Sequence, residues 1–221
     1  MIRVSFFAAA IAAVAQCCRL EPTYAQLDTT KLPNCFTTAT RAKTPVKHFY
    51  EMVSGKSRLE DTEFAKGTPA LYWANMGESS GNVATLDKTH TIEWSRAGDL
   101  VPNARLFPEQ GIRLADLDKS FKENNWIVAA LTALAETPGR IEKLFLNMEP
   151  TQASGGIYAV NLYTFGFPMT VMVDDYLPQV KVPNKPVTTL FSYLGNDLPL
   201  WAPLMEKVFA KRYGNYEHIT S

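Results

Sequence analysis

Cysteine is scarce in this chain of 221 residues, and its three cysteines, Cys17, Cys18 and Cys35, all lie near the N-terminus. An odd number of cysteines without paired spacing does not provide a disulfide framework. No pair of histidines or cysteines follows at the spacing of a zinc site. The sequence therefore predicts no metal and no cofactor, and we interpret the thiols as small apolar side chains.

The chain also lacks a surplus of positive charge, since 22 Lys and Arg stand against 22 Asp and Glu. Nucleic-acid-binding proteins need a basic surplus to displace counterions, so we expect no nucleic-acid partner. Internal repeats and low-complexity tracts are missing as well. Hydrophobic residues make up 46% of the chain, which is enough for one domain with a core of its own.

Residues 1–20 contain no acidic residue, and an apolar run occupies positions 4–15. This run is shorter than the roughly 20 residues that cross a bilayer as a helix. Three interpretations stay open. Ala13 and Ala15 have the spacing of a signal-peptidase site, which indicates a secretory signal, whereas Arg3 and Arg19 without acidic neighbours are typical of a mitochondrial presequence. The third is an uncleaved arm in contact with a partner or, through residues 1–18, with a membrane. We slightly favour the mitochondrial location over the secretory pathway and over the cytoskeleton or flagellum.

The N-terminal half predicts only a few elements. Residues 46–53 could form a short helix, and residues 68–76 and 89–94 are interpreted as strands. No family is suggested for this region, which could be a β-rich module or an arm that wraps a partner. We expect three parts: an apolar segment at 1–20, an N-terminal region of unknown fold at 21–112 and a half-domain at 113–221.

Helical spacing becomes clear in the second half of the chain. Ser120 and Glu123 have the pattern of a capping box. A helix is expected to follow from the apolar spacing of Trp126, Ile127, Ala130, Leu131, Leu134 and Ala135. Pro138 and Gly139 end this helix, and residues 140–146 are predicted to form a short second one.

Two strands, residues 157–164 and 169–173, predict a hairpin with a turn at Gly166. Pro178, Pro183 and Pro186 are expected to keep the next stretch irregular, before a short strand at 190–193. A last helix is predicted from an Asp197 cap, with Pro199 in its first turn, to Gly214. Helices with a small antiparallel sheet make this an α+β fold.

Three segments of the second half, in the same order and spacing, resemble the calpain family of papain-like cysteine proteases. The segments are Asn125-Trp126-Ile127-Val128-Ala129-Ala130-Leu131, Val171-Met172-Val173-Asp174-Asp175-Tyr176-Leu177-Pro178 and the run from Trp201 to Glu217. The resemblance covers residues 113–219 and implies the helical half of a protease core. Residues 134–138 with Leu144 and Phe145 also resemble small calpain-related proteins of protists.

The resemblance fails at the positions that would carry catalysis. The family places its nucleophilic cysteine immediately before the tryptophan, where this chain has Asn125. The glutamine that helps to bind the oxyanion corresponds to Lys119, and both glycines of the family's Gly-x-Leu-Gly-Asp run are replaced. A carboxamide is no useful nucleophile at neutral pH, and oxyanion binding is expected to be lost as well.

The family's histidine and asparagine come from a second half that follows these segments. The histidines here, His48, His90 and His218, are expected to have structural or surface roles. Ser120 has no base placed for it, and Asp174 and Asp175 supply too few oxygens for calcium. We therefore expect Asn125→Cys not to restore cleavage.

The sequence thus predicts a protein that is not an enzyme and has no small-molecule substrate. Our first hypothesis is a structural or scaffolding subunit of a larger protein assembly, because a half-domain should expose apolar surface that a partner covers. The alternative is a pseudoprotease regulator that binds an active calpain or extended peptides without cleaving them. An active enzyme of another type would need a motif that the sequence does not contain.

Overall fold

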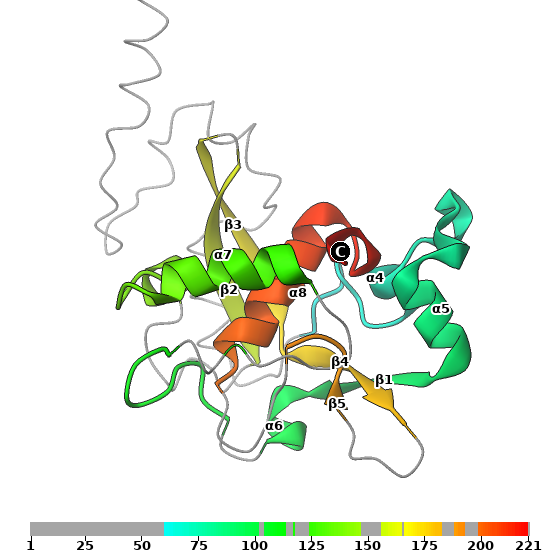
Figure 1. Cartoon of the computed structure of the whole chain (residues 1–221), viewed down its shortest axis with the longest axis horizontal. Helices are drawn as coiled ribbons and strands as arrows, with labels where there is room; N and C mark the ends of the chain where they lie inside the picture. The colour runs from blue at the N-terminus through cyan, green and yellow to red at the C-terminus, as the bar shows by residue number, and fades with distance from the viewer. Residues whose placement is uncertain are drawn as a thin grey trace, which may run out of the picture.

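The computed structural model describes residues 60–101, 104–113, 117, 124–146, 156–164, 166–182, 188–192 and 199–220. The apolar N-terminal segment, the expected helix at 46–53, Lys119, the capping box and Asp197 lie outside the described residues. The described part is α+β, as predicted (Figure 1). Its elements, in chain order, are α4 (Thr68–Leu71), η2 (Ala74–Met76), η3 (Glu78–Ser80), α5 (Asn82–Thr89), β1 (Thr91–Arg96), α6 (Ala97–Leu100), α7 (Asn125–Ala135), η5 (Glu142–Leu144), β2 (Ile157–Thr164), β3 (Phe167–Asp174), β4 (Tyr176–Lys181), β5 (Thr188–Thr189), α8 (Trp201–Tyr213) and η7 (Glu217–Ile219).

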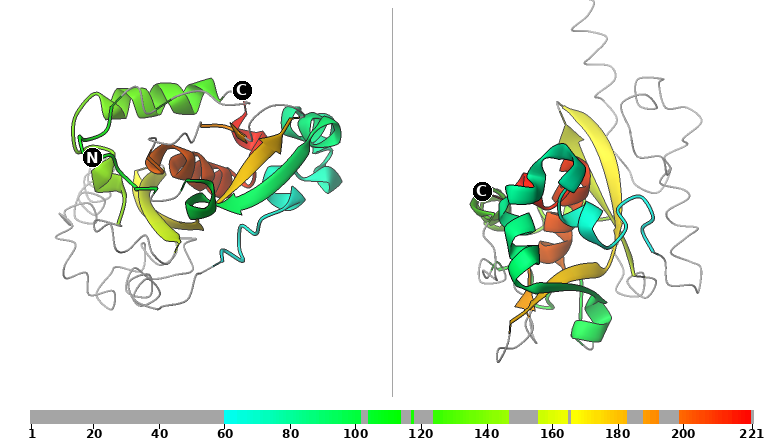
Figure 2. Two further views of the ribbon diagram at one scale, coloured as in Figure 1. Left: turned by 90° about the horizontal axis from the view of Figure 1, so that it is seen from below. Right: turned by 90° about the vertical axis from the view of Figure 1, so that its right-hand side faces the viewer.

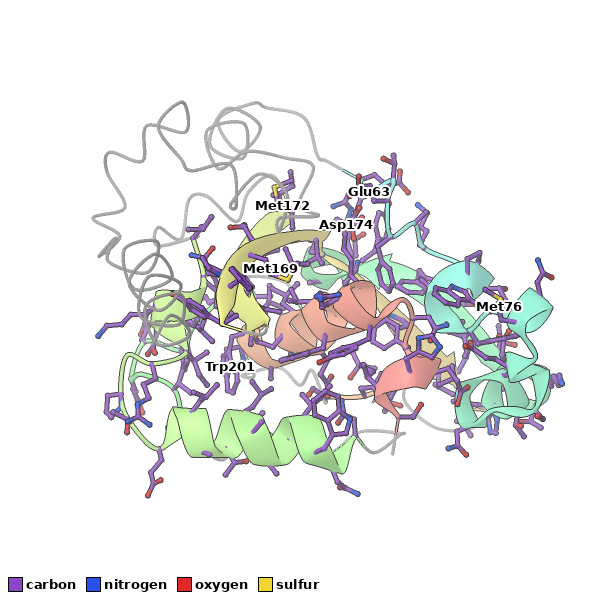
Figure 3. The ribbon with its side chains drawn as sticks, turned by 90° about the horizontal axis from the view of Figure 1, so that it is seen from above. Glu63, Met76, Met169, Met172, Asp174 and Trp201 are labelled. Carbon is purple, nitrogen blue, oxygen red and sulfur yellow. The ribbon has the colours of Figure 1, made fainter. Side chains whose placement is uncertain are left out.

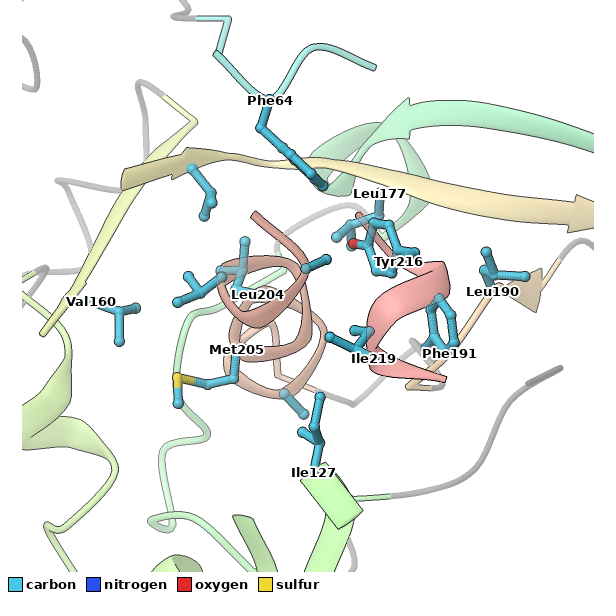
Figure 4. Packing of buried hydrophobic residues seen from close by; sticks show 14 of the residues in the cluster. Phe64, Ile127, Val160, Leu177, Leu190, Phe191, Leu204, Met205, Tyr216 and Ile219 are labelled. Atoms are coloured by element: carbon cyan, nitrogen blue, oxygen red, sulfur yellow. The ribbon is translucent and has the colours of Figure 1, made fainter. Parts of the chain in front are cut away.

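Helix α8 runs through the centre of the fold. Every residue from Trp201 to Val208 is buried, including Glu206 and Lys207. The hairpin β2–β3 and the sheet β1–β4–β5 pack around it, while α7 lies along its outer side (Figures 1 and 2). Figure 4 shows the apolar side chains that meet around α8. The helix begins at Trp201 with Leu200 as its N-cap residue, so the prediction that Pro199 lies in the first turn is wrong.

The core also includes side chains from the region for which the sequence suggested no family. Phe64, Leu71 and Val83 are buried in the same cluster as Leu204 and Tyr216. The rings of Phe64 and Tyr216 lie 6.1 Å apart. Residues 60–101 therefore share one core with the described residues between 124 and 220.

The predicted hairpin is confirmed: β2 and β3 are antiparallel, and Gly166 takes the positive φ of 81° that the turn needs. The second sheet joins distant segments, since β1 pairs with β4 from Thr91↔Lys181 to Arg96↔Tyr176 and β4 pairs with β5. The expected strand at 89–94 is therefore present, displaced by two residues.

Residues 68–76 are not the strand that their short apolar run predicts. They form α4 and η2 instead. Gly67 enters with a φ of 129°, Pro69 lies in the first turn, and the Trp73 amide donates to a side chain, Glu78 Oε2, at 2.6 Å. A glycine and a proline at a helix start favour a helical turn, and a short apolar run does not distinguish the two structures.

The stretch around Pro178 is not irregular, because β4 runs through it. The missing N–H of Pro178 costs one donor, but its carbonyl still accepts from the Leu190 amide at 2.8 Å. Two smaller predictions shift as well: only Glu142–Leu144 is helical within 140–146, and the short strand is Thr188–Thr189 rather than 190–193.

Candidate functional site

The start of α7 is the position that the sequence analysis singled out. Asn125 is the first helical residue and is exposed, whereas Asn124 before it is buried. The Asn124 carbonyl accepts the amides of Ile127 and Val128 at 3.0 and 3.1 Å. Its side chain does not cap the helix and turns inward instead. The exposed residue at the helix tip is therefore an amide, and the one behind it is part of the core.

A buried carboxylate lies behind the helix start. Glu206 of α8 accepts from Asn124 Nδ2 at 2.5 Å through one oxygen and from the Ser192 amide at 2.8 Å through the other. Burial raises the pKa of Glu206 to about 7, and the two hydrogen bonds oppose that rise. Sequence reasoning missed this group; the signal was a glutamate that follows the apolar run at 201–205 in one helix.

Trp126 links α7 to the C-terminal turn. Its indole Nε1 donates to the Ile219 carbonyl at 3.0 Å. Its ring packs edge-on against Phe209 and Tyr213 of α8, with centroids 5.7 and 6.1 Å away. The side chain nevertheless stays 42% exposed. Trp126 therefore anchors the helix start and still presents a surface to solvent.

Both ring nitrogens of His218 have acceptors as neighbours. Nδ1 lies 2.7 Å from the Tyr213 carbonyl and Nε2 lies 2.5 Å from Glu78 Oε1. His90 contacts the Thr89 hydroxyl at 2.9 Å, and His48 lies outside the described residues. Among the described residues, the ring nitrogens of His218 are thus directed at Tyr213 and Glu78 and that of His90 at Thr89.

The two aspartates of the Asp-Asp-x-Leu-Pro motif are bound by cations of the protein itself. Asp174 contacts Lys207 and accepts the Asp61 amide at 2.7 Å. Asp175 binds Arg96 at 2.5 Å; burial raises the pKa of Asp175, and the guanidinium opposes the rise. Among the described residues, no three His, Cys, Asp or Glu side chains lie together in a way that could hold a metal ion.

Helix α7 presents an apolar face to solvent. Its sequence contains no charged residue, and only Ile127, Leu131 and Ala135 are buried. The exposed residues on its outer side are Trp126, Ala129, Ala130 and Ala133. Figure 3 shows α7 along one side of the molecule. A helix without charges normally has neighbours all round, so this face differs from an ordinary solvent-facing surface. None of the described helices is long and apolar enough to span a bilayer.

Comparison with known proteins places the chain in a family. Residues 59–221 match the family model described as calpain family cysteine protease. The chain belongs to the calpain family. It is 26% identical over 171 residues to the calpain-1 catalytic subunit of Gallus gallus, covering 77% of this chain and 23% of that protein. It is 33% identical to calpain-5 of Mus musculus and 30% identical to calpain-5 of Caenorhabditis elegans, each over 58% of this chain and 20% of the relative.

The chain thus spans about a fifth of the length of the curated calpains that it matches. The resemblance to calpains and the α+β fold predicted from the sequence are confirmed. The calpain match also begins earlier than expected, at residue 59, and so includes α4, α5 and β1. Lys119, the expected oxyanion position, lies outside the described residues.

Proposed function

We propose that this chain is a catalytically inactive calpain-family protein that serves as a structural subunit, using the outer face of α7 to bind a partner protein. The observation that carries the proposal is Asn125, the exposed first residue of α7, at the position where the family resemblance places the nucleophilic cysteine.

The chemistry at a helix N-terminus supports the proposal that the chain is catalytically inactive. Calpain-type cleavage needs a thiolate, which the helix dipole stabilises there. The Asn125 amide does not ionise, and its nitrogen lone pair is delocalised into the carbonyl. His218 is held by Tyr213 and Glu78, so it offers no base to residue 125 in this arrangement.

The proposal that the chain binds a partner protein rests on the composition and exposure of α7. Ala129, Ala130 and Ala133 form a flat apolar strip that continues to Trp126. Small side chains let another backbone approach closely, and exposed aromatic rings are favoured anchors at interfaces. The strip carries no charge, so a fitting partner is a protein with an apolar, uncharged surface.

Inactivity is tested with the purified full chain, calcium and fluorogenic peptides. We expect no turnover above the buffer blank and no labelling of residue 125 by a thiol-directed electrophile. Asn125→Cys should be labelled but should still not cleave, because His218, of the described residues, is held by Tyr213 and Glu78 and His90 contacts Thr89. Turnover that Asn125→Ala abolishes would refute the proposal, and peptidase activity of Asn125→Cys would show that a base is present.

Partner binding is tested by the native size of the tagged full chain isolated from its own cells. Ala130→Glu and Ala133→Glu place a charge on the strip, and both should shift the chain from a larger complex to the monomer. Thr91→Glu, on exposed β1, is the matched control and should leave the complex intact. A monodisperse wild-type monomer, or loss of the complex in the control alone, argues against a structural subunit.

The alternative is a regulator that binds an active calpain or extended peptides beside Asn125. The exposure of both Asn125 and Trp126 leaves that end of α7 accessible. Recovery of a calpain catalytic subunit in the complex would select this alternative over a scaffold. The mitochondrial location and the likeness to protist proteins stay predictions from the sequence.

A further inference from the structure

We propose that the C-terminal turn, η7, is a pH-sensitive latch, closed while His218 is protonated and opened when His218 loses its proton. When closed, it holds both the start of α5 and the indole of Trp126. The inference does not depend on whether the chain cleaves peptides.

Three successive residues of η7 contact three different parts of the fold. Glu217 accepts the amides of α5, from Asn82 at 2.7 Å, Val83 at 2.6 Å and Ala84 at 3.2 Å. His218 contacts Glu78, and the Ile219 carbonyl accepts from Trp126. Figure 1 shows η7 between α5 and α7, beside the C-terminus. A turn this short cannot move one of these contacts without disturbing the others.

The geometry around His218 fits a ring that carries two protons. The Tyr213 carbonyl can only accept, so Nδ1 must carry a hydrogen. Glu78 Oε2 already accepts from the Trp73 amide at 2.6 Å and from Asn215 Nδ2 at 2.8 Å, as expected for an ionised carboxylate. Glu78 Oε1 therefore accepts from Nε2, and the pair is an imidazolium with a carboxylate.

The other groups around the ring favour the same state. Its charged neighbours among the described residues are Glu78 of η3 and Glu217 of its own turn. The Trp73 ring stands edge-on at 5.0 Å, and the His218 amide donates to Asn215 Oδ1 at 2.9 Å. Among the described residues, the charged side chains that shift the pKa of the ring are the carboxylates of Glu78 and Glu217.

The pKa directions of the two partners agree. Burial by itself lowers the pKa of His218, but the Tyr213 carbonyl and the Glu78 carboxylate outweigh it and raise that pKa. Burial raises the pKa of Glu78, but the Trp73 amide and His218 outweigh it and lower that pKa. Stability from His218 is complete below its unfolded pKa and is lost as pH rises through the raised one. The latch is thus closed in mildly acidic solution and opens on the alkaline side.

Opening follows from the loss of one hydrogen. A neutral imidazole has a single N–H, so it can donate to the Tyr213 carbonyl or to Glu78 but not to both. When the remaining hydrogen is on Nδ1, the lone pair of Nε2 faces the Glu78 carboxylate, and the two repel each other. The turn is expected to loosen, which weakens the Glu217 cap on α5 and the acceptor of Trp126.

Hydrogen exchange of the full chain, recorded by NMR between pH 5.5 and 8.5, tests the latch. Protection factors, which correct for the intrinsic pH dependence of exchange, are followed for the Trp126 indole and the amides of Val83 and Ala84. We expect them to fall several-fold as His218 titrates, with a His218 pKa above its ordinary 6.5. The fall should follow the His218 ring signal rather than the signal of His90.

His218→Gln should show low protection that does not change with pH, while His90→Gln should behave as wild type. Glu78→Gln is a second variant in case His218→Gln does not fold, and it should bring the pKa of His218 down. The latch is overturned if wild-type protection does not change with pH, or if His218 titrates at or below 6.5. It is also overturned if both His218→Gln and Glu78→Gln keep wild-type protection.

Discussion

Lys207 and Asp174 form an ion pair in the interior, with side-chain exposures of only 1% and 2%. The ammonium also donates to the Tyr176 carbonyl at 2.6 Å, and Asp174 accepts the amides of Asp61 and Tyr176. One pair therefore connects α8, the bend between β3 and β4, and the backbone at Asp61. Asp174 therefore ends a strand, as predicted, and also connects distant parts of the domain.

Removing one partner of this pair should be costly. Lys207→Met leaves the Asp174 carboxylate buried without its cation, so we expect a loss of about 3–5 kcal/mol in the free energy of unfolding. Urea denaturation measures it. Lys181→Met, from the exposed pair with Glu93, is the control and should change stability by less than about 1 kcal/mol. A loss no larger than that of the control would mean that Asp174 does not need its cation.

Glu206 should make stability fall as pH rises. Its folded pKa of about 7 lies above the ordinary 4.5, so the folded state holds the proton more tightly than the unfolded state. Stability is then lost between those two values, by roughly 3 kcal/mol in total at about 1.4 kcal/mol for each pH unit.

Glu206→Gln removes that titration. The difference in unfolding free energy between the variant and wild type should therefore move in favour of the variant from pH 4.5 to 7.5. Urea denaturation at a series of pH values gives this difference, which also cancels the titration of all other groups. A difference independent of pH would show that Glu206 titrates normally.

Glu217 caps α5 from a distance of more than 130 positions along the chain. It takes the place of the side-chain cap that Gly81, the N-cap residue, cannot supply. Glu217→Ala should cost about 1–2 kcal/mol and raise amide exchange at Val83 and Ala84. Glu93→Ala, on exposed β1, should leave exchange at these amides unchanged, and equal effects of the two changes would mean that Glu217 is no cap.

Gly214 ends α8 with a φ of 112°, and a Cβ added there would lie 2.6 Å from the Trp73 ring. Gly214→Ala therefore combines backbone strain with a clash and should cost about 1–3 kcal/mol in thermal or urea unfolding. Gly98→Ala is a matched control in α6, where no atom lies within 4 Å, and should be neutral or slightly stabilising. If Gly214→Ala matches Gly98→Ala, Trp73 does not pack as described.

Some helices and strands could be predicted from the spacing of apolar residues and turn residues within their own segment. The apolar spacing of Ile127 and Leu131 predicts α7, and Gly166 between two alternating runs predicts the hairpin β2–β3. Helix α5 carried no such signal, because its cap, Glu217, comes from a turn at the other end of the described chain. For residues 68–76, a short apolar run favoured a strand, and the glycine and proline at the helix start decided otherwise.

The sequence by itself determined the family, the α+β class and the amide at position 125, because these depend on residue identity and local spacing. Only the tertiary structure decided that Asn124 donates to a buried Glu206 and that Asp174 forms an ion pair with Lys207. It also decided that η7 accepts hydrogen bonds from both α5 and α7. Partners of these kinds lie 33 to 134 positions apart along the chain. Contacts at such separations leave no periodic trace in a sequence, because they depend on how whole elements pack against one another.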